Sequence, residues 1–121
     1  MDKKLKKNDD NSIPSHDQIR HSILTILYKK AEVNPNHNIV HREQVIELLN
    51  VPENIVDFDI KYLEQENLIK TEASMESWVW AEITSSGINV IEHKDENKKR
   101  FPFLSATIPI QIVNKIGIFT F

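Results

Sequence analysis

Apolar residues follow helical spacing in the first half of the chain. Between Asp17 and about Ala31 they fall at Ile19, Ile23, Ile26, Leu27 and Ala31. This is the i, i+4, i+7, i+8 stripe of an amphipathic helix. The polar segment VNPNHN then ends the helix, and the residues at 39 and 40 are long enough only for a brief strand.

Two shorter helices are expected next, joined by a tight turn. Residues 42–49 form a helix with Val45, Leu48 and Leu49 facing inward. Pro52 suits the first turn of a third helix, because that position needs no backbone N–H donor. In this third helix one face is apolar, formed by Val56, Ile60 and Leu63.

A β-hairpin and a last helix complete the pattern. Asn67 ends the third helix, a strand begins at Leu68, ASMES turns the chain, and WVWAEIT alternates like a returning strand. Thr84 or Ser85 caps a final helix, with Ile88 and Ile91 packing inward. The predicted fold class is mainly α with a small antiparallel β-hairpin, in the order of a winged helix-turn-helix.

The stretch VHREQVIELLNVPENIVDFDIKYLEQENLIK, with WAEITSSGINVIE after it, is similar to the MarR- and PadR-like winged-helix regulators. In those regulators a helix-turn-helix ends in a Leu-x-x-x-Gly-Leu-Ile step, and a strand ends in a Leu-Thr-x-x-Gly turn. Asn67 replaces the usual glycine, and asparagine also tolerates left-handed geometry. The resemblance covers roughly residues 17–93, and the matching positions are Leu63, Leu68, Ile69, Ile83, Thr84 and Gly87.

The resemblance implies a DNA-binding transcriptional regulator whose third helix enters the major groove. His41 and Arg42 open the second helix, where free backbone N–H groups favour a phosphate. Lys70 lies near the hairpin. The residues expected to face the DNA from the third helix are Asn54, Asp57, Phe58, Lys61, Tyr62 and Gln65.

The charge of the third helix favours a second interpretation. Between Glu53 and Asn67 there are five acids and one base, Lys61, whereas phosphate contacts supply most nonspecific DNA affinity. Either the acids face solvent away from the groove, as expected for Asp59, Glu64 and Glu66, or the helix reads no DNA. In the second case the domain is a winged-helix protein-interaction module.

Aromatic residues on the same helix bear on this choice. Phe58 and Tyr62 are four residues apart and so share a face. With Ile55 beside them, they form either a protein-docking patch or rings that fold over the core of the domain.

The chain divides into three parts: a polar tail at 1–15, the winged-helix domain at 16–93, and a charged linker with an apolar segment at 94–121. The tail, with its lysines at 3, 4, 6 and 7, is expected to be disordered. The apolar segment is expected to be an edge strand, because Ile108, Ile110 and Ile112 alternate and Pro109 interrupts them.

Strand alternation also predicts that Trp78 and Trp80 point away from the core. We expect the C-terminal segment to cover them, packing on its own domain or in a homodimer whose symmetry suits operator half-sites. The interaction surface predicted in this way comprises Trp78, Trp80, Phe101, Phe103, Ile108, Ile110 and Ile112.

Composition and motifs argue against several other functional classes of protein. The chain of 121 residues has no cysteine and a net charge of −3, so thiol chemistry is excluded and no general attraction to nucleic acid exists. No signal peptide or transmembrane run is present, which predicts a cytoplasmic protein. His37 and His41 lack the context of a metal site, and no phosphate-binding glycine loop exists. We expect no cofactor, no metal and no enzymatic activity.

Overall fold

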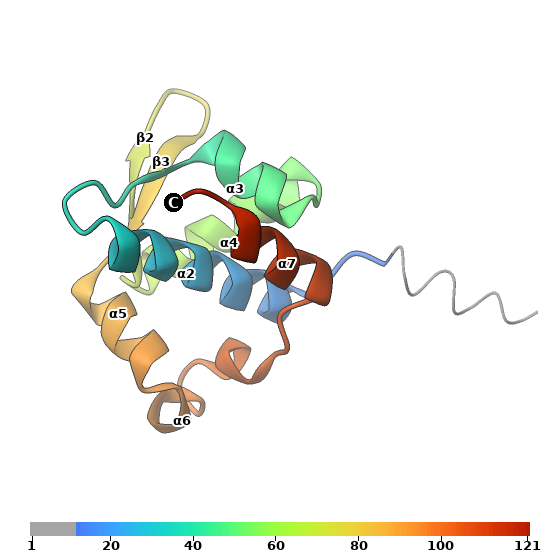
Figure 1. The fold of residues 1–121 in the computed structure, drawn as a ribbon, viewed down its shortest axis with the longest axis vertical. Helices are drawn as coiled ribbons and strands as arrows, with labels where there is room; N and C mark the ends of the chain where they lie inside the picture. The colour runs from blue at the N-terminus through green and yellow to red at the C-terminus, as the bar shows by residue number, and fades with distance from the viewer. Residues whose placement is uncertain (1–11) are drawn as a thin grey trace, which may run out of the picture.

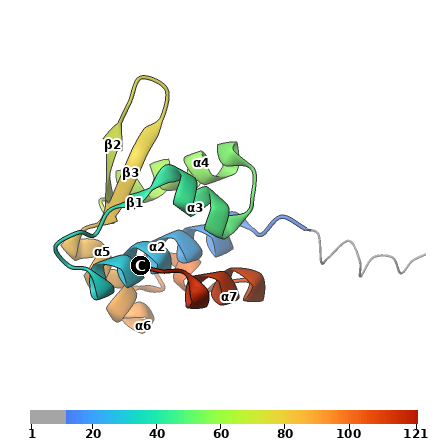
Figure 2. The ribbon, with the colours of Figure 1, turned by 45° about the horizontal axis from the view of Figure 1, so that its top comes forward.

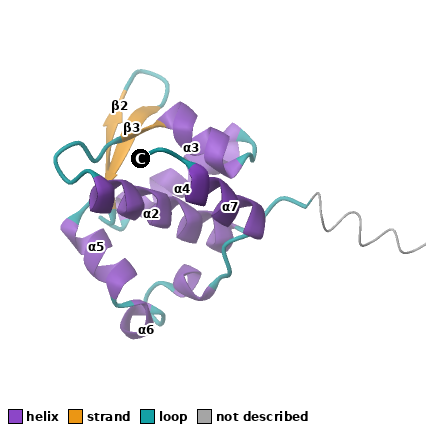
Figure 3. Cartoon of the chain, viewed as in Figure 1, coloured by secondary structure: helices purple, strands orange, loops and turns teal. Residues whose placement is uncertain are grey.

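The structure is a computed structural model that describes residues 12–121. The predicted disorder and the lysine cluster of residues 1–11 lie outside this range. Within it, the chain is mainly helical with one small antiparallel sheet, as predicted (Figures 1 and 3). The elements are α2 (His16–Val33), β1 (Val40–His41), α3 (Arg42–Leu49), α4 (Glu53–Gln65), β2 (Ile69–Ala73), β3 (Trp78–Ile83), α5 (Ser85–Glu92), α6 (Lys94–Asn97), a 3-10 turn η1 (Pro102–Ser105) and α7 (Ile110–Ile118).

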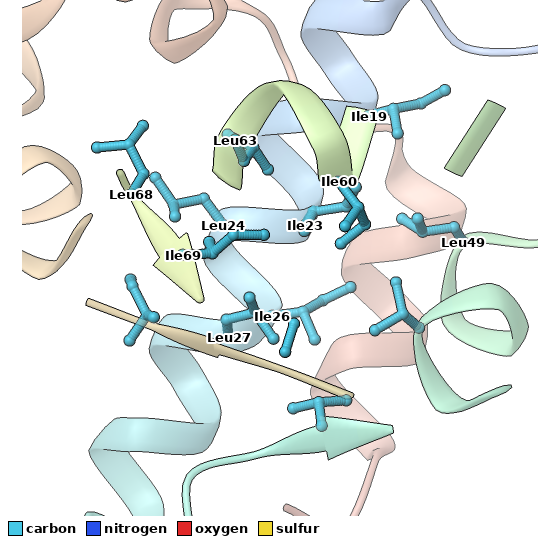
Figure 4. Packing of buried hydrophobic residues seen from close by; sticks show 14 of the residues in the cluster. Ile19, Ile23, Leu24, Ile26, Leu27, Leu49, Ile60, Leu63, Leu68 and Ile69 are labelled. Atoms are coloured by element: carbon cyan, nitrogen blue, oxygen red, sulfur yellow. The ribbon is translucent and has the colours of Figure 1, made fainter. Parts of the chain in front are cut away.

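Helix α2 is the central element of the fold. Ser15 caps it, because the Ser15 hydroxyl accepts from the Gln18 backbone N–H at 3.1 Å and the Gln18 side chain accepts from the Ser15 N–H at 3.0 Å. Its apolar side packs against α3, α4, α5, β3 and η1. Figure 4 shows Ile19, Ile23 and Leu27 among the side chains of this core.

The three strands are antiparallel and lie in the order β1-β3-β2. The two-residue strand β1 pairs with β3 through Val40 opposite Ala81. The hairpin of β2 and β3 extends beyond the helices (Figure 2).

Left-handed asparagines and a threonine cap set the local turns. Asn50 ends α3 with φ of 53°, and Asn67 follows α4 with φ of 63°, as the sequence predicted for Asn67. Thr84 caps α5, its hydroxyl accepting from the Gly87 N–H at 3.0 Å. A Cβ at Gly87 would lie 2.2 Å from the Leu68 carbonyl oxygen, so the absence of a side chain lets α5 approach the end of α4 closely.

The orientation predicted for the two tryptophans is wrong for Trp78. Ala81 and Ile83 face the core as expected, but Val79 is exposed and Trp78 is buried. Trp80 is half-buried. The simple alternation of β3 is therefore interrupted between Trp78 and Trp80.

A β-bulge explains this orientation. Trp80 lies opposite Glu72, and Trp78 lies opposite the very next residue, Ala73. Val79 is therefore an extra residue on β3 without a partner on β2. Such an insertion moves the following side chain to the other face of the sheet, and Trp78 joins the core.

The strand predicted near residues 108–112 is a helix. Pro109 precedes α7, and its carbonyl oxygen accepts from the N–H groups of Ile112 and Val113, both at 3.0 Å. Ile108, just before the helix, and Ile112, on the helix, both pack inward, while Ile110 points outward. An alternation over only three apolar residues is thus too short to distinguish a strand from a helix.

The C-terminal part belongs to the folded unit. Phe101, Phe103 and Leu104 are buried in the same core as α2. The Nδ1–H of His21 on α2 donates to the Ala106 carbonyl oxygen at 2.7 Å. Burial lowers the pKa of His21, which favours the neutral ring. The packed region therefore extends well beyond residue 93.

Candidate interaction surface

The solvent-facing side of α4 is a narrow stripe. It comprises Asn54, Phe58, Lys61 and Gln65, all exposed and spaced by four, three and four residues. We call this set the α4 stripe. Phe58 is 59% exposed and contacts only the edge of the domain, where its ring centre lies 5.0 Å from that of His16. Of the six residues expected to face DNA from this helix, these four do face solvent.

Asp57 lies beside the stripe and is bonded within the domain. Its Oδ1 accepts from the Trp78 indole N–H at 2.8 Å, and its Oδ2 accepts from Arg42 Nη2 at 2.9 Å. Arg42 Nη2 also donates to Glu53 at 3.2 Å. The hydrogen bond to Asp57 raises the pKa of Arg42. Arg42 and Asp57, both expected at a DNA interface, instead join α3, α4 and β3 to one another.

Asp59 was expected to face solvent, but it is fully buried. Its carboxylate accepts from Arg20 Nε at 2.7 Å and lies 2.8 Å from His16 Nδ1. A signal for this burial exists in the sequence. Asp59 is three residues after Val56 and four before Leu63, which places it on the apolar face of α4.

Tyr62 is half-buried rather than turned outward. The Arg20 guanidinium lies 3.8 Å from the centre of its ring, and Phe103 meets it edge-on at 6.3 Å. Burial raises the pKa of Tyr62. Of the two aromatic residues on α4, Tyr62 folds over the core and Phe58 remains exposed, so they do not form a common patch.

The other carboxylates of this helix also have partners. Glu64 accepts from the Thr71 hydroxyl at 2.8 Å. Glu66 lies 3.9 Å from the Arg100 guanidinium. With Glu53, Asp57 and Asp59 already bonded, all five acids noted in the sequence contact a cation or a donor from another part of the fold. The acids therefore hold the helix in place as well as giving it charge.

The cations predicted to hold phosphate differ in how available they are. Lys70 pairs with Glu82 at 3.3 Å. His41 is exposed, and its backbone N–H donates to the Gln44 side chain at 2.9 Å. Lys61 is exposed and makes no hydrogen bond or ion pair with any residue from 12 to 121. Among the predicted contact residues, Lys61 is the only lysine or arginine in that range without such a bond.

The segment from β1 to β3 is strongly acidic. Residues 40–83 contain ten Asp and Glu but three Lys and Arg, a net charge of −7 in a chain whose total is −3. Glu53 is 67% exposed, and Glu72 and Glu76 of the hairpin are also exposed. Hydrogen bonds from Thr71 and Trp78 hold this hairpin against α4, so these exposed acids lie on α4 and on a hairpin that contacts it.

Most of the residues predicted to form an interaction surface, from the tryptophans to the C-terminal segment, are instead buried. Trp78, Phe101, Phe103 and Ile112 are buried, and Trp80 and Ile108 are half-buried. Ile110 alone of that set is exposed.

An open groove lies elsewhere, between residues 12–14, the end of α3 and α7. Its volume is about 540 Å³. Its wall includes Ile13, Pro109, Ile112 and Lys115.

Residues 12–121 hold no cluster of three potential metal ligands among His, Cys, Asp and Glu. None of the helices in this range has the length and apolarity needed to span a bilayer. No protein-family model, curated protein or solved structure matches the chain. The geometry and charge of its own residues are therefore the basis for a functional proposal.

Proposed function

We propose that this protein is a winged-helix protein-interaction module, whose α4 stripe and exposed acids bind a basic segment of a partner protein. The single observation that carries this proposal is the net charge of −7 in residues 40–83, the segment that also carries the exposed Phe58. The order of helices and strands, with β1 joining the hairpin, supports the winged-helix architecture.

Duplex DNA is the less suitable partner. A protein that grips duplex DNA neutralises several phosphates with lysine and arginine. Here Arg42 is bonded to two carboxylates and Lys70 to one, which leaves Lys61 as the free cation of the helix. Glu53 at the start of α4 is 67% exposed, and its carboxylate would repel phosphates that approach within a Debye length of about 8 Å.

A basic peptide suits the same surface. Phe58 offers an apolar anchor of the kind enriched at the centres of protein interfaces. Glu53, Glu72 and Glu76 offer exposed negative charges on α4 and on the hairpin. Opposite charge at the rim accelerates association and selects the partner, while the aromatic ring supplies affinity. The exposed negative charge that disfavours DNA thus favours a basic partner.

The test compares two labelled probes by fluorescence anisotropy over a range of salt concentrations. One probe is a mixed-sequence DNA duplex, and the other is a lysine-rich peptide with a central leucine. We expect the peptide to bind, and we expect added salt to weaken this binding. Phe58→Ala should reduce its affinity by about fivefold or more, since interface anchors contribute over about 1 kcal/mol.

Two further variants separate the outcomes. Val33→Ala changes an exposed apolar residue at the opposite end of α2 from His16, the neighbour of Phe58, and should leave peptide affinity unchanged. Salt-sensitive binding of the duplex that Lys61→Ala weakens would overturn the proposal in favour of a DNA-binding regulator. Equal peptide affinities for Phe58→Ala and the parent protein would also overturn it.

A further inference from the structure

His21 lies where α2 meets the segment that follows η1. It is 6% exposed, and its Nδ1–H donates to the Ala106 carbonyl oxygen at 2.7 Å. Three residues earlier on α2, the Gln18 side-chain amide donates to the carbonyl of the next residue, Thr107, at 3.0 Å. In Figure 1 this segment connects α6 to α7 along the lower side of α2. Two side chains of α2 therefore hold two consecutive carbonyls of the segment.

The second ring nitrogen of His21 is buried without a hydrogen-bond partner among residues 12–121. Because Nδ1 carries the proton, Nε2 holds a lone pair. A proton added at Nε2 would place a positive charge and an unpaired donor in the interior, and an unpaired buried charge is far less favourable than an unpaired neutral group. The Thr25 hydroxyl, one turn further along α2, also lacks a partner in this range, and as a neutral group it cannot balance the charge.

The charged groups around His21 would not offset such a proton. Lys94 of α6 is a cation and, after burial, a second influence that lowers the pKa of His21. The segment η1 has no titratable side chain, and the buried carboxylate of α4, Asp59, is held by Arg20 and His16. The carboxylates of α2, α5 and α6 are all exposed, and none is bonded to the ring; they are Asp17, Glu32, Glu92, Asp95 and Glu96.

We infer that His21 is a pH-sensitive switch, whose neutral ring holds residues 102–107 against α2 and whose protonation releases them. Phe103 and Leu104 of this segment are buried in the core. Their release would uncover the apolar side of α2 and lower the stability of the domain. The switch is independent of the binding proposed for α4, because none of its contacts involves the α4 stripe.

The direction of the pH dependence follows from the two states of His21. In the released segment the pKa of His21 returns to its ordinary value near 6.5, whereas burial holds it lower when the segment is docked. The released state therefore binds more protons between these two values. Docking is fully favoured above about pH 6.5, and it weakens as the pH falls below that value toward the lower pKa. Since one proton is involved, the ratio of released to docked protein rises by up to about tenfold per pH unit in this range.

The experiment is amide hydrogen exchange on the full chain between about pH 7.5 and about pH 5, corrected for intrinsic exchange rates. The reporters are the N–H groups of Leu104 and Ala106, which donate to the Phe101 and Phe103 carbonyls, both at 3.0 Å. Their opening equilibrium should be constant above about pH 6.5 and should rise below it, approaching about tenfold per pH unit.

Two variants isolate His21 from the other titrating groups. In His21→Asn the amide of the new side chain supplies a donor near the place of Nδ1 and takes up no proton in this range, so the rise in opening should disappear. His93→Asn is the matched control, because the His93 Nδ1 also lies 3.0 Å from a carbonyl, that of Asn89, but the ring is exposed. This control should keep the pH dependence of the parent.

The ring itself gives a second readout, which does not depend on whether His21→Asn folds. Nitrogen chemical shifts of His21 in the parent should show the Nδ1–H tautomer at neutral pH, with protonation only at pH values where Leu104 and Ala106 open. The inference is overturned by an equal rise of opening with acid in His21→Asn and the parent. It is also overturned by an Nε2–H tautomer, or by a protonated ring while the segment stays docked.

Discussion

At the scale of single residues, Asp59 connects two helices through a buried carboxylate. It lies on α4, and both of its partners, Arg20 and His16, lie on the first two turns of α2. The same two partners contact the aromatic residues of α4, since Arg20 covers the ring of Tyr62 and His16 contacts Phe58. The orientation of the α4 stripe therefore depends on this charge cluster.

Replacing Asp59 should strongly destabilise the fold. Asp59→Ala leaves the Arg20 guanidinium, itself mostly buried, without its anion, and breaking a buried pair in this way lowers the free energy of unfolding by about 3–5 kcal/mol. Urea denaturation near pH 7 measures the change. Glu32→Ala removes an exposed pair with Lys29 and serves as the control, with an expected loss below about 1 kcal/mol. Equal losses in the two variants would contradict a structural role for Asp59.

At the scale of elements, the close packing of α5 against the end of α4 depends on a glycine. Thr84 caps α5, and its backbone N–H donates to the Leu68 carbonyl at 3.0 Å. The same carbonyl oxygen occupies the place where a side chain of Gly87 would be. Backbone atoms cannot move aside as a flexible side chain can, so α5 itself would have to shift.

The two glycines of the chain should respond to alanine in opposite directions. Gly87→Ala should lower the free energy of unfolding by about 1–3 kcal/mol, because its Cβ would also approach Ile83 Cγ1 at 2.7 Å. Gly117→Ala lies on an open helix surface and should raise it by up to about 1 kcal/mol. Thermal unfolding of both variants followed by circular dichroism provides the comparison. Stabilisation by Gly87→Ala would show that α5 does not approach α4 so closely.

Element positions followed from the sequence where local chemistry alone specifies them. The helix at 42–49 and the capping by Thr84 agree with the structure, because apolar period and side-chain caps act within a few residues. The bulge at Val79 was not predictable in this way. It arises from the pairing of β3 with β2, and pairing is a property of two strands, not of one sequence segment.

At the scale of the whole molecule, the C-terminal segment completes the core. Phe101, Phe103 and Leu104 pack with α2. The last residues of the chain then return to the C-terminal end of α2. There Lys30 and Asn34 both donate to the Phe121 carbonyl at 2.7 Å. In Figure 1 this final segment, drawn in red, lies across α2.

Truncation should therefore have graded effects. A chain ending at residue 93 loses four large buried side chains, namely Phe101, Phe103, Leu104 and Ile112. Each contributes about 1.5–3 kcal/mol, and together they are comparable to the whole stability of a small domain. We expect no cooperative thermal transition. A chain ending at residue 107 keeps η1 and loses α7, so it should still unfold cooperatively at a lower temperature. Cooperative unfolding of the shorter chain at the temperature of the parent would show that residues 16–93 form a complete core.

The candidate site was only partly predictable for a related reason. Helical spacing placed Asn54, Phe58 and Lys61 on one exposed face, as the structure has them. Whether Arg42 is free to bind a phosphate could not be derived from the sequence, because its partners Asp57 and Glu53 belong to another helix. Which charges pair, and which remain free for a ligand, depends on distances between elements far apart in the sequence.

The sequence by itself determined the order of elements from α2 to α5, the apolar residues that face inward on α2, α3 and α4, and the cap of α5, since these depend on neighbouring residues. Only the tertiary structure decided that Asp59 is buried, that Trp78 faces inward and that residues 110–118 form a helix. These outcomes depend on contacts across the core, where desolvation and packing against distant residues outweigh local preference. The acids of α4, unexpected in a DNA reader, hold this helix to the rest of the domain.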